Sequence, residues 1–207
     1  MPRLIGEKLV LREYTKEDLP HMREWVNDWE VTRLLSDVFL YPHTMNQTEA
    51  FLNLMLENKD ETRSMFVLAS KDSLEYIGQV SLFKIDWKNR IAELGIVISK
   101  KDCQGKGLGK EAIELLQYFA FNKLNLNKLE LSVHDFNERA IKCYKKCGFA
   151  QEGRLRKKFY FDGKYSDSIL MGILKDEYEA RESKTRDFIF KRNGILGGNS
   201  NEISGKS

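Results

Sequence analysis

The chain has 207 residues, of which 42% are hydrophobic, and this length and composition suit one well-filled globular domain. The sequence has 34 basic and 31 acidic residues, and the resulting net charge of +3 gives no strong case for nucleic-acid binding. The sequence contains no apolar run long enough to cross a bilayer and no signal-peptide hydrophobic region, and its three cysteines argue against a disulfide framework. We therefore expect a cytoplasmic protein with neither nucleic acid nor membrane as its partner.

The first part of the chain predicts one strand followed by two helices. Apolar residues alternate over residues 8–13, which indicates a strand. Residues 15–18 form an acidic helix start, and apolar residues at helical spacing continue from there to Val26. The segment 46–49 resembles a capping box and predicts the start of the second helix.

The middle of the chain predicts consecutive strands over 65–69, 76–85 and 91–99, joined by short turns that favour antiparallel pairing. The remaining elements are, in chain order, a helix over 108–121, a strand over 128–133, a helix from 135 to Gly148, and a closing hairpin of 159–161 with 168–174. Residues 181–207 are polar and end in a run of Gly, Asn and Ser. We expect one domain over 1–180 and a flexible tail over 181–207.

A glycine-rich loop, Gln104-Gly-Lys-Gly-Leu-Gly-Lys110, connects a predicted strand to a predicted helix. Glycines there let backbone N–H groups approach an anion, and the helix N-terminus adds positive potential, so the loop predicts a phosphate or pyrophosphate site. The spacing excludes a Walker loop, because Gln104 and Glu111 stand where a glycine and a Ser or Thr are required. A Rossmann fingerprint would need Gly or Ala at Lys110.

The pattern that remains is Gln-x-x-Gly-x-Gly at Gln104, Gly107 and Gly109, and it resembles the acetyl-coenzyme A (acetyl-CoA) pyrophosphate loop of the GCN5-related N-acetyltransferases, or GNAT family. A second motif resembles the segment that closes the coenzyme A site in that family, with matches at Asn137, Ala140, Tyr144, Gly148 and Phe149. The resemblance covers residues 8 to 175. It is greatest to the group of ribosomal-protein alanine and spermidine N-acetyltransferases.

The resemblance implies an α/β (α+β) fold with a mixed, mostly antiparallel sheet that is flanked by helices and splays at the cofactor site, near Ile98. It also implies transfer of acetyl from acetyl-CoA to a primary amine by direct attack, without a metal. The implied cofactor-binding residues come from three segments. A strand whose backbone pairs with the pantetheine arm supplies Ile96, Val97 and Ile98. The pyrophosphate loop supplies Gln104, Gly105, Lys106, Gly107, Leu108, Gly109 and Lys110, and the second motif supplies Asn137, Ala140 and Tyr144.

Two residues are candidates for the chemistry. Tyr144 matches the family's general acid, which would protonate the leaving thiolate, although a tyrosine on the apolar stripe of a helix is also typical of a core. Glu93 lies on the strand that enters the loop and is the best candidate for a base, since an alkyl amine with a pKa near 10 must lose a proton before it attacks. A salt-bridged strand carboxylate is the alternative for Glu93, and His134 is a weaker candidate base.

The acceptor is left open between a protein N-terminus, a polyamine and another small amine. Six residues lie where the family builds its acceptor wall, or else form an ordinary helix-loop surface: Trp25, Asp28, Trp29, Glu30, Asp37 and Tyr41. Cys143 and Cys147 are four residues apart, but the sequence completes no metal site around them. A homodimer is possible in the resembled group, and a catalytically silent acyl-CoA sensor is the alternative function.

Overall fold

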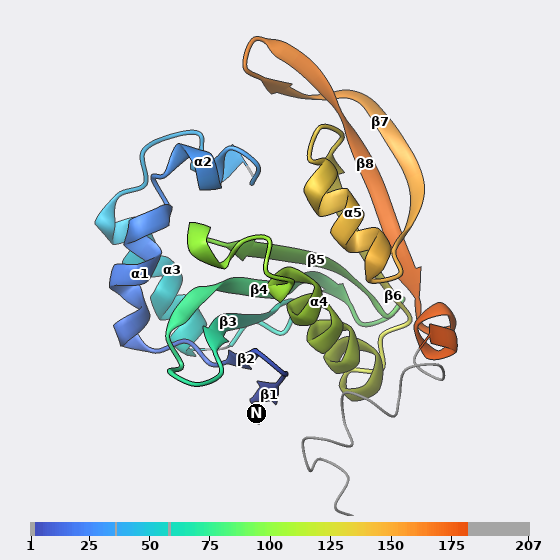
Figure 1. Ribbon diagram of the computed structural model, residues 1–207, viewed down its shortest axis with the longest axis horizontal. Coiled ribbons are helices and arrows are strands. Elements are labelled where there is room, and N and C mark those ends of the chain that lie inside the picture. The colour runs from blue at the N-terminus through green and yellow to red at the C-terminus, as the bar shows by residue number, and fades with distance from the viewer. Residues whose placement is uncertain (1–2, 36, 58, 182–207) are drawn as a thin grey trace, which may run out of the picture.

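A computed structural model describes residues 3–35, 37–57 and 59–181 (Figure 1). The strands are β1 (Leu4–Ile5), β2 (Leu9–Arg12), β3 (Ser64–Ser70), β4 (Tyr76–Asp86), β5 (Ile91–Ile98), β6 (Lys128–His134), β7 (Ala150–Phe161) and β8 (Lys164–Leu174). The helices are α1 (Leu19–Trp25), α2 (Trp29–Thr32), α3 (Met45–Glu57), α4 (Leu108–Tyr118) and α5 (Glu138–Lys146). Residues 175–181 are also helical. The expected tail, apart from its first residue, lies outside the described residues.

In the described part of the chain, one sheet of eight strands has the order β1-β2-β3-β4-β5-β6-β8-β7. Every neighbouring pair is antiparallel except β5 and β6, which are parallel. Parallel strands need a long crossover, and here the crossover consists of the glycine-rich loop and α4. The mixed, mostly antiparallel sheet predicted from the sequence is therefore confirmed.

The sheet splays between its two parallel strands. β5 and β6 pair only over three residues each, ending with Glu93 opposite Glu130. Beyond that point β5 stays with β4 as far as Ile98, and β6 stays with β8 as far as His134. In Figure 1 the far end of β5 lies between α1–α3 on one side and α5 with the β7–β8 hairpin on the other. The predicted splay is therefore present, but it begins directly after Glu93 rather than near Ile98.

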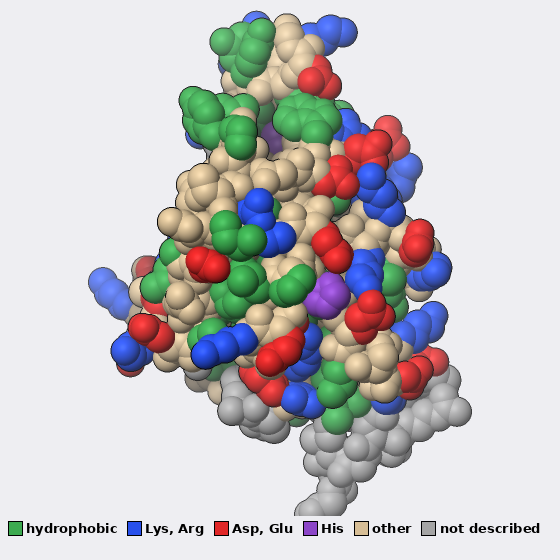
Figure 2. Space-filling model, turned by 90° about the vertical axis from the view of Figure 1, so that its left-hand side faces the viewer, with side chains coloured by type: hydrophobic (Ala, Val, Ile, Leu, Met, Phe, Trp, Pro, Cys, Tyr) green, Lys and Arg blue, Asp and Glu red, His purple; other side chains and the backbone are tan. Residues whose placement is uncertain are grey.

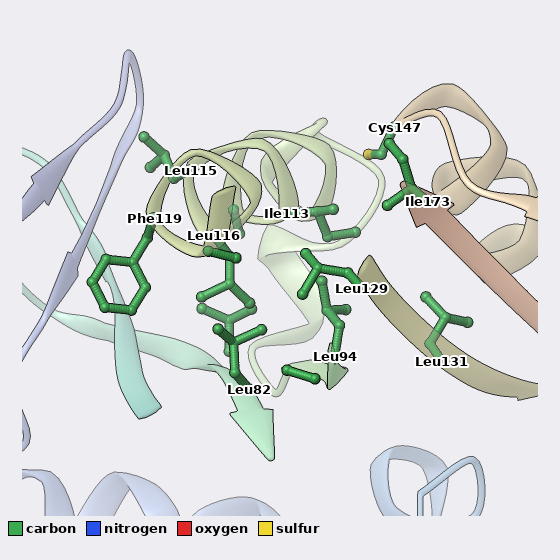
Figure 3. Packing of buried hydrophobic residues seen from close by; sticks show 14 of the residues in the cluster. Leu82, Leu94, Ile113, Leu115, Leu116, Phe119, Leu129, Leu131, Cys147 and Ile173 are labelled. Atoms are coloured by element: carbon green, nitrogen blue, oxygen red, sulfur yellow. The ribbon is translucent and has the colours of Figure 1, made fainter. Parts of the chain in front are cut away.

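Hydrophobic cores lie on both faces of the sheet. On one face, the apolar stripe of α4 packs against side chains from β4, β5, β6 and β8 (Figure 3): Leu82, Leu94, Ile113, Leu116, Phe119, Leu129, Leu131 and Ile173. On the other face, α1 and α3 cover a smaller cluster that includes Val10, Met22, Trp25, Leu52, Val67 and Tyr76. Since side chains alternate along a strand, Ala92 and Leu94 face α4, whereas Glu93 faces the opposite side of the sheet.

Two local predictions are wrong. The capping box of α3 is formed by Thr44 and Gln47: the Gln47 Oε1 accepts from the Thr44 N–H at 2.7 Å, and the Gln47 N–H donates to Thr44 Oγ1 at 3.3 Å. The helix consequently begins at Met45, before the predicted segment 46–49. The closing hairpin is also much longer than predicted, because β7 already begins at Ala150. None of the described helices has the length and apolarity that a membrane-spanning helix requires.

Gly78 on β4 packs closely against the backbone of β5, the strand that leads into the glycine-rich loop. A Cβ at this position would overlap the carbonyl oxygen of Val97 on β5. We therefore expect Gly78→Ala to lower the free energy of unfolding by about 1–3 kcal/mol, as overpacking does, measured by urea denaturation. Gly153→Ala in β7 is the matched control, because its Cβ would meet its nearest neighbour, Leu170 Cδ1, at an ordinary 3.5 Å. Equal stability of the two variants would contradict this account.

Candidate active site

The glycine-rich loop has the backbone geometry that an anion site requires. Gly105 and Gly107 have φ angles of +76° and +84°, which favour glycine, and a Cβ added at either residue would meet nothing within 4 Å. Gly107 is the N-cap residue of α4, and no side chain caps this helix start. The loop therefore presents uncovered backbone next to a positive helix end. This arrangement fits the diphosphate of acetyl-CoA.

The other loop residues differ in their surroundings. Lys106 is exposed and Leu108 is buried in the core below the loop. Lys110 does not point toward the loop, because its ammonium pairs with Glu114 one turn along α4, at 2.7 Å. Gln104 donates from its Nε2 to the carbonyl oxygen of Ile98 at 3.0 Å, which joins the loop to the end of β5.

The register of β4 and β5 fixes the direction of the β5 backbone groups. The Ser99 N–H donates to the Ile77 carbonyl oxygen at 3.1 Å. In an antiparallel pair every second residue is hydrogen-bonded to its partner. Val97, two residues before Ser99, therefore forms its backbone hydrogen bonds with Gln79, its partner in the register. The backbone groups of Ile96 and Ile98 then point away from β4, toward the side from which β6 has diverged. Of the three β5 residues predicted to bind the cofactor, Ile96 and Ile98 have the backbone direction that strand-like pairing requires.

The helix α5 carries Tyr144 and begins at a side-chain cap. Asn137 Oδ1 accepts from the Ala140 N–H at 3.2 Å, so this oxygen is used for capping. Tyr144 packs edge-on against Phe149 with ring centroids 5.9 Å apart. Among the described residues, its hydroxyl has no hydrogen-bond partner. Burial raises the pKa of Tyr144, so the phenol stays protonated near neutral pH and is able to donate a proton.

Glu93 lies at the point where β5 and β6 part, and it forms an ion pair. Its Oε2 accepts from the Lys84 ammonium at 2.7 Å. Lys84 has a φ of +50° where the β4–β5 register shifts, so an irregularity in β4 brings this lysine to the carboxylate. The hydrogen bond and charge of Glu93 raise the pKa of Lys84. The salt-bridged state that the sequence left open for Glu93 is thus present, and its carboxylate binds a primary ammonium.

An aromatic cluster that sequence reasoning missed joins α2 to the β7–β8 hairpin. Phe161 stacks on Trp29 with ring centroids 6.0 Å apart and an interplanar angle of 3°. Phe136 stacks on Phe161 at 5.0 Å, and His134 contacts both Phe136 and Phe159. Figure 2 shows hydrophobic side chains gathered at the upper end of the molecule, at the height of α2 and the hairpin tip, with charged side chains beside them. These residues come from α2, the end of β6, the loop that follows β6 and β7, and no sequence pattern predicts that these four segments meet.

The residues predicted to form the acceptor wall separate into different environments. Trp25 is only 3% exposed and donates from Nε1 to the Tyr76 hydroxyl, so it belongs to the core and the prediction is wrong for this residue. Trp29 and Tyr41 are exposed. The carboxylates of Asp28 and Glu30 both pair with Lys101, at 3.3 and 2.5 Å. The side chain of Asp37 lies outside the described part of the structure.

Cys143 of α5 and Cys147, the C-cap residue of that helix, contact each other beside the start of α4. A hydrogen bond from Cys147 lowers the pKa of Cys143, and the same contact raises the pKa of the buried Cys147. The Cys147 Sγ also lies 3.8 Å from the Lys110 carbonyl oxygen. Within residues 3–181, apart from the two gaps, no cluster of three His, Cys, Asp or Glu side chains is arranged to hold a metal ion.

Comparisons with known proteins agree with this geometry. The acetyltransferase (GNAT) domain family matches residues 8–150. Spermidine N(1)-acetyltransferase of Escherichia coli K12 is 37% identical over 179 residues, which cover 84% of this chain and 90% of that protein. The crystal structure of spermidine N-acetyltransferase from Vibrio cholerae in complex with CoA and spermine has a TM-score of 0.73 at 29% identity, over 83% of this chain and 98% of that one. Human alpha/beta-tubulin-N-acetyltransferase 9 is 30% identical over 158 residues, covering 72% of this chain and 75% of that protein.

The chain therefore belongs to the GNAT family of acetyltransferases. It is an acetyl-CoA-dependent enzyme that transfers the acetyl group to an amine. The family, the fold and the reaction predicted from the sequence are confirmed.

Proposed function

We propose that this enzyme acetylates a primary amine of a polyamine such as spermidine or spermine. The observation that carries the proposal is the Glu93–Lys84 pair: at the point where the strands part, a carboxylate binds a primary alkyl ammonium at 2.7 Å. A polyamine presents the same chemical group. The relative from E. coli and the structure from V. cholerae, both polyamine acetyltransferases by name, match over nearly their whole lengths.

Two further features suit an acceptor with several positive charges: a second carboxylate beside Glu93, and an aromatic surface farther along the β7–β8 hairpin. Glu130 lies opposite Glu93 in the register and faces the same side of the sheet. The stacked rings of Trp29 and Phe161 add aromatic faces farther away, near the β7–β8 turn, because Phe161 pairs with Lys164, eight residues along β8 from Gly172, the partner of Glu130. The Arg33 guanidinium already lies 6.0 Å from the Phe161 centroid. Carboxylates and aromatic faces both attract alkyl ammonium groups. A cationic acceptor is therefore favoured over a neutral or anionic one.

In this proposal, each group of residues has one task. The backbone of Gly105 to Lys110 binds the diphosphate of acetyl-CoA. The outward backbone groups of Ile96 and the outward N–H of Ile98 hold the pantetheine arm, while the Ile98 carbonyl oxygen accepts from Gln104. Glu93 accepts the proton of the acceptor ammonium, directly or through water, once that ammonium has replaced Lys84. The neutral amine attacks the thioester carbonyl. The Tyr144 hydroxyl donates its proton to the departing thiolate. These tasks belong to one domain over residues 1–180.

A second class of acceptor, a protein amine, is suggested by the similarity to the human tubulin acetyltransferase, but that similarity covers less of both chains. Neither the comparisons nor the site supports a catalytically silent sensor. The proposal is tested by measuring thiol release from acetyl-CoA with spermidine, spermine, a simple monoamine, an amino sugar and a peptide N-terminus. We expect kcat/KM for a polyamine to exceed that of the monoamine at least about tenfold, since each added ion pair contributes on the order of 1 kcal/mol. A peptide or an amino sugar as the best acceptor would overturn the proposal.

A further inference from the structure

The side chain of Gln104 makes two hydrogen bonds that join separate elements. Its Nε2 donates to the carbonyl oxygen of Ile98, at the end of β5, at 3.0 Å. Its Oε1 accepts from the Arg139 Nη1, in the first turn of α5, at 2.8 Å. Gln104 immediately precedes Gly105, so the side chain that makes both contacts is attached to the first residue of the cofactor loop.

The two partners leave only one arrangement of the Gln104 amide. A carbonyl oxygen can only accept a hydrogen bond and a guanidinium can only donate one. The amide must therefore direct its NH₂ group to Ile98 and its oxygen to Arg139. Glutamate in this place would offer no donor to Ile98, and alanine would remove both contacts.

Arg139 differs from the other charged residues of its helix face. Glu138 and Lys142 pair with each other along α5 at 2.8 Å, as neighbours i and i+4 do on many helices. Arg139 instead reaches a residue 35 positions earlier in the chain. The contact connects the loop to the helix that carries Tyr144, across the side on which β5 and β6 have parted. It also holds a permanent positive charge beside a loop that receives a diphosphate.

We propose that Arg139 is a positioning residue for acetyl-CoA: it orients Gln104, and through Gln104 it fixes the cofactor loop against the end of β5. The proposal rests on the cofactor site described under the proposed function and is independent of the acceptor. Without Arg139, Gln104 is held on one side only, and the loop samples orientations in which its N–H groups no longer converge on the diphosphate. Ordering the loop when acetyl-CoA binds then costs free energy, which weakens the binding.

The direct test is a double-mutant cycle on acetyl-CoA binding, measured by titration calorimetry in the absence of any acceptor. We expect Arg139→Ala and Gln104→Ala each to weaken binding about three- to tenfold. The double variant should bind acetyl-CoA about as tightly as whichever single variant has the lower affinity, because both substitutions break the same contact. Lys142→Ala, an exposed residue of the same helix, should bind like the native protein. Native-like binding by Arg139→Ala, or losses that multiply in the double variant, would overturn the proposal.

Steady-state kinetics supply a second readout. Arg139→Ala should raise the KM for acetyl-CoA while leaving the KM of the acceptor within about twofold, and Arg139→Lys, which keeps a charge and a donor, should recover part of the loss. A rise of both KM values together would indicate a general disturbance of the fold and would count against a positioning role. If the binding cycle behaves as expected but no polyamine is acetylated, the acceptor assignment fails and the role of Arg139 stands.

Discussion

Tyr144→Phe should lower kcat by at least about a hundredfold, the usual contribution of a positioned general acid. The substitution removes only the hydroxyl, so the edge-on contact of the ring with Phe149 is kept and the fold should be unaffected. We expect the KM for acetyl-CoA to change by less than about threefold, since the proton is needed in the transition state rather than in the ground state. The measurement is thiol release at saturating acetyl-CoA with the best amine of the panel.

A second buried tyrosine is the matched control. Tyr178 packs against Phe121, and its hydroxyl accepts from Asn122 at 3.2 Å. Tyr178→Phe should cost stability but leave kcat within about twofold. If the two variants have equal kcat values, Tyr144 has only a packing role.

The pH profile gives an independent check on Tyr144. A general acid must be protonated, and burial raises the pKa of Tyr144 above its ordinary value of about 10. Activity should therefore not decline through ionisation of this group as the pH rises from 7 to 9, and it should increase as more of the acceptor amine becomes neutral. A kcat that falls between pH 7 and pH 9, with a fall that disappears in Tyr144→Phe, would contradict the raised pKa.

Asp18→Asn should lower the free energy of unfolding by about 3–5 kcal/mol, the usual cost of removing one partner from a buried ion pair. Arg12 donates to both carboxylate oxygens of Asp18, at 2.7 and 2.9 Å, and the two side chains are 8% and 2% exposed. Asp18 also accepts from the Thr15 N–H at 2.8 Å, so it joins β2 to the start of α1. The variant leaves the Arg12 charge buried without its counter-charge. Urea denaturation measures the effect.

An exposed ion pair provides the comparison. Glu138→Gln breaks the pair with Lys142, in which both side chains are more than two-thirds exposed, and should cost less than about 1 kcal/mol. Replacing both buried partners by apolar residues, Arg12→Met with Asp18→Leu, should recover part of the loss because no charge is then left unpaired. A loss below about 1 kcal/mol for Asp18→Asn would show that the buried pair contributes no more than a surface one.

The sequence was most informative where one physical constraint acts locally. Gly105 and Gly107 were recognisable because few other residues adopt their φ angles, and the stripe of α4 was recognisable because a buried helix face repeats along the chain. The splay of the sheet followed from the resemblance, which placed it near Ile98, and no pattern in β5 indicates that the strands already part after Glu93.

The errors have equally physical reasons. The unpredicted part of β7, residues 150–158, lies at an edge of the sheet and is almost wholly exposed, with a basic run at Arg154, Arg156, Lys157 and Lys158, so it lacks the alternation that marks a half-buried strand. The capping box was displaced because Asn46 and Glu49 offer the same side-chain chemistry as the true pair, Thr44 and Gln47. The Gln104–Arg139 contact and the stack of Trp29 on Phe161 join residues 35 or more positions apart, and only the fold brings such pairs together.

The most direct test of this account is to identify the product formed from spermidine and acetyl-CoA by mass spectrometry and NMR. The account predicts a spermidine that carries one acetyl group on a terminal primary amine, formed in equal amount with free CoA thiol. Acetyl-CoA that binds normally but yields no acetylated spermidine, or an acetyl group on another acceptor at a much higher rate, would contradict it.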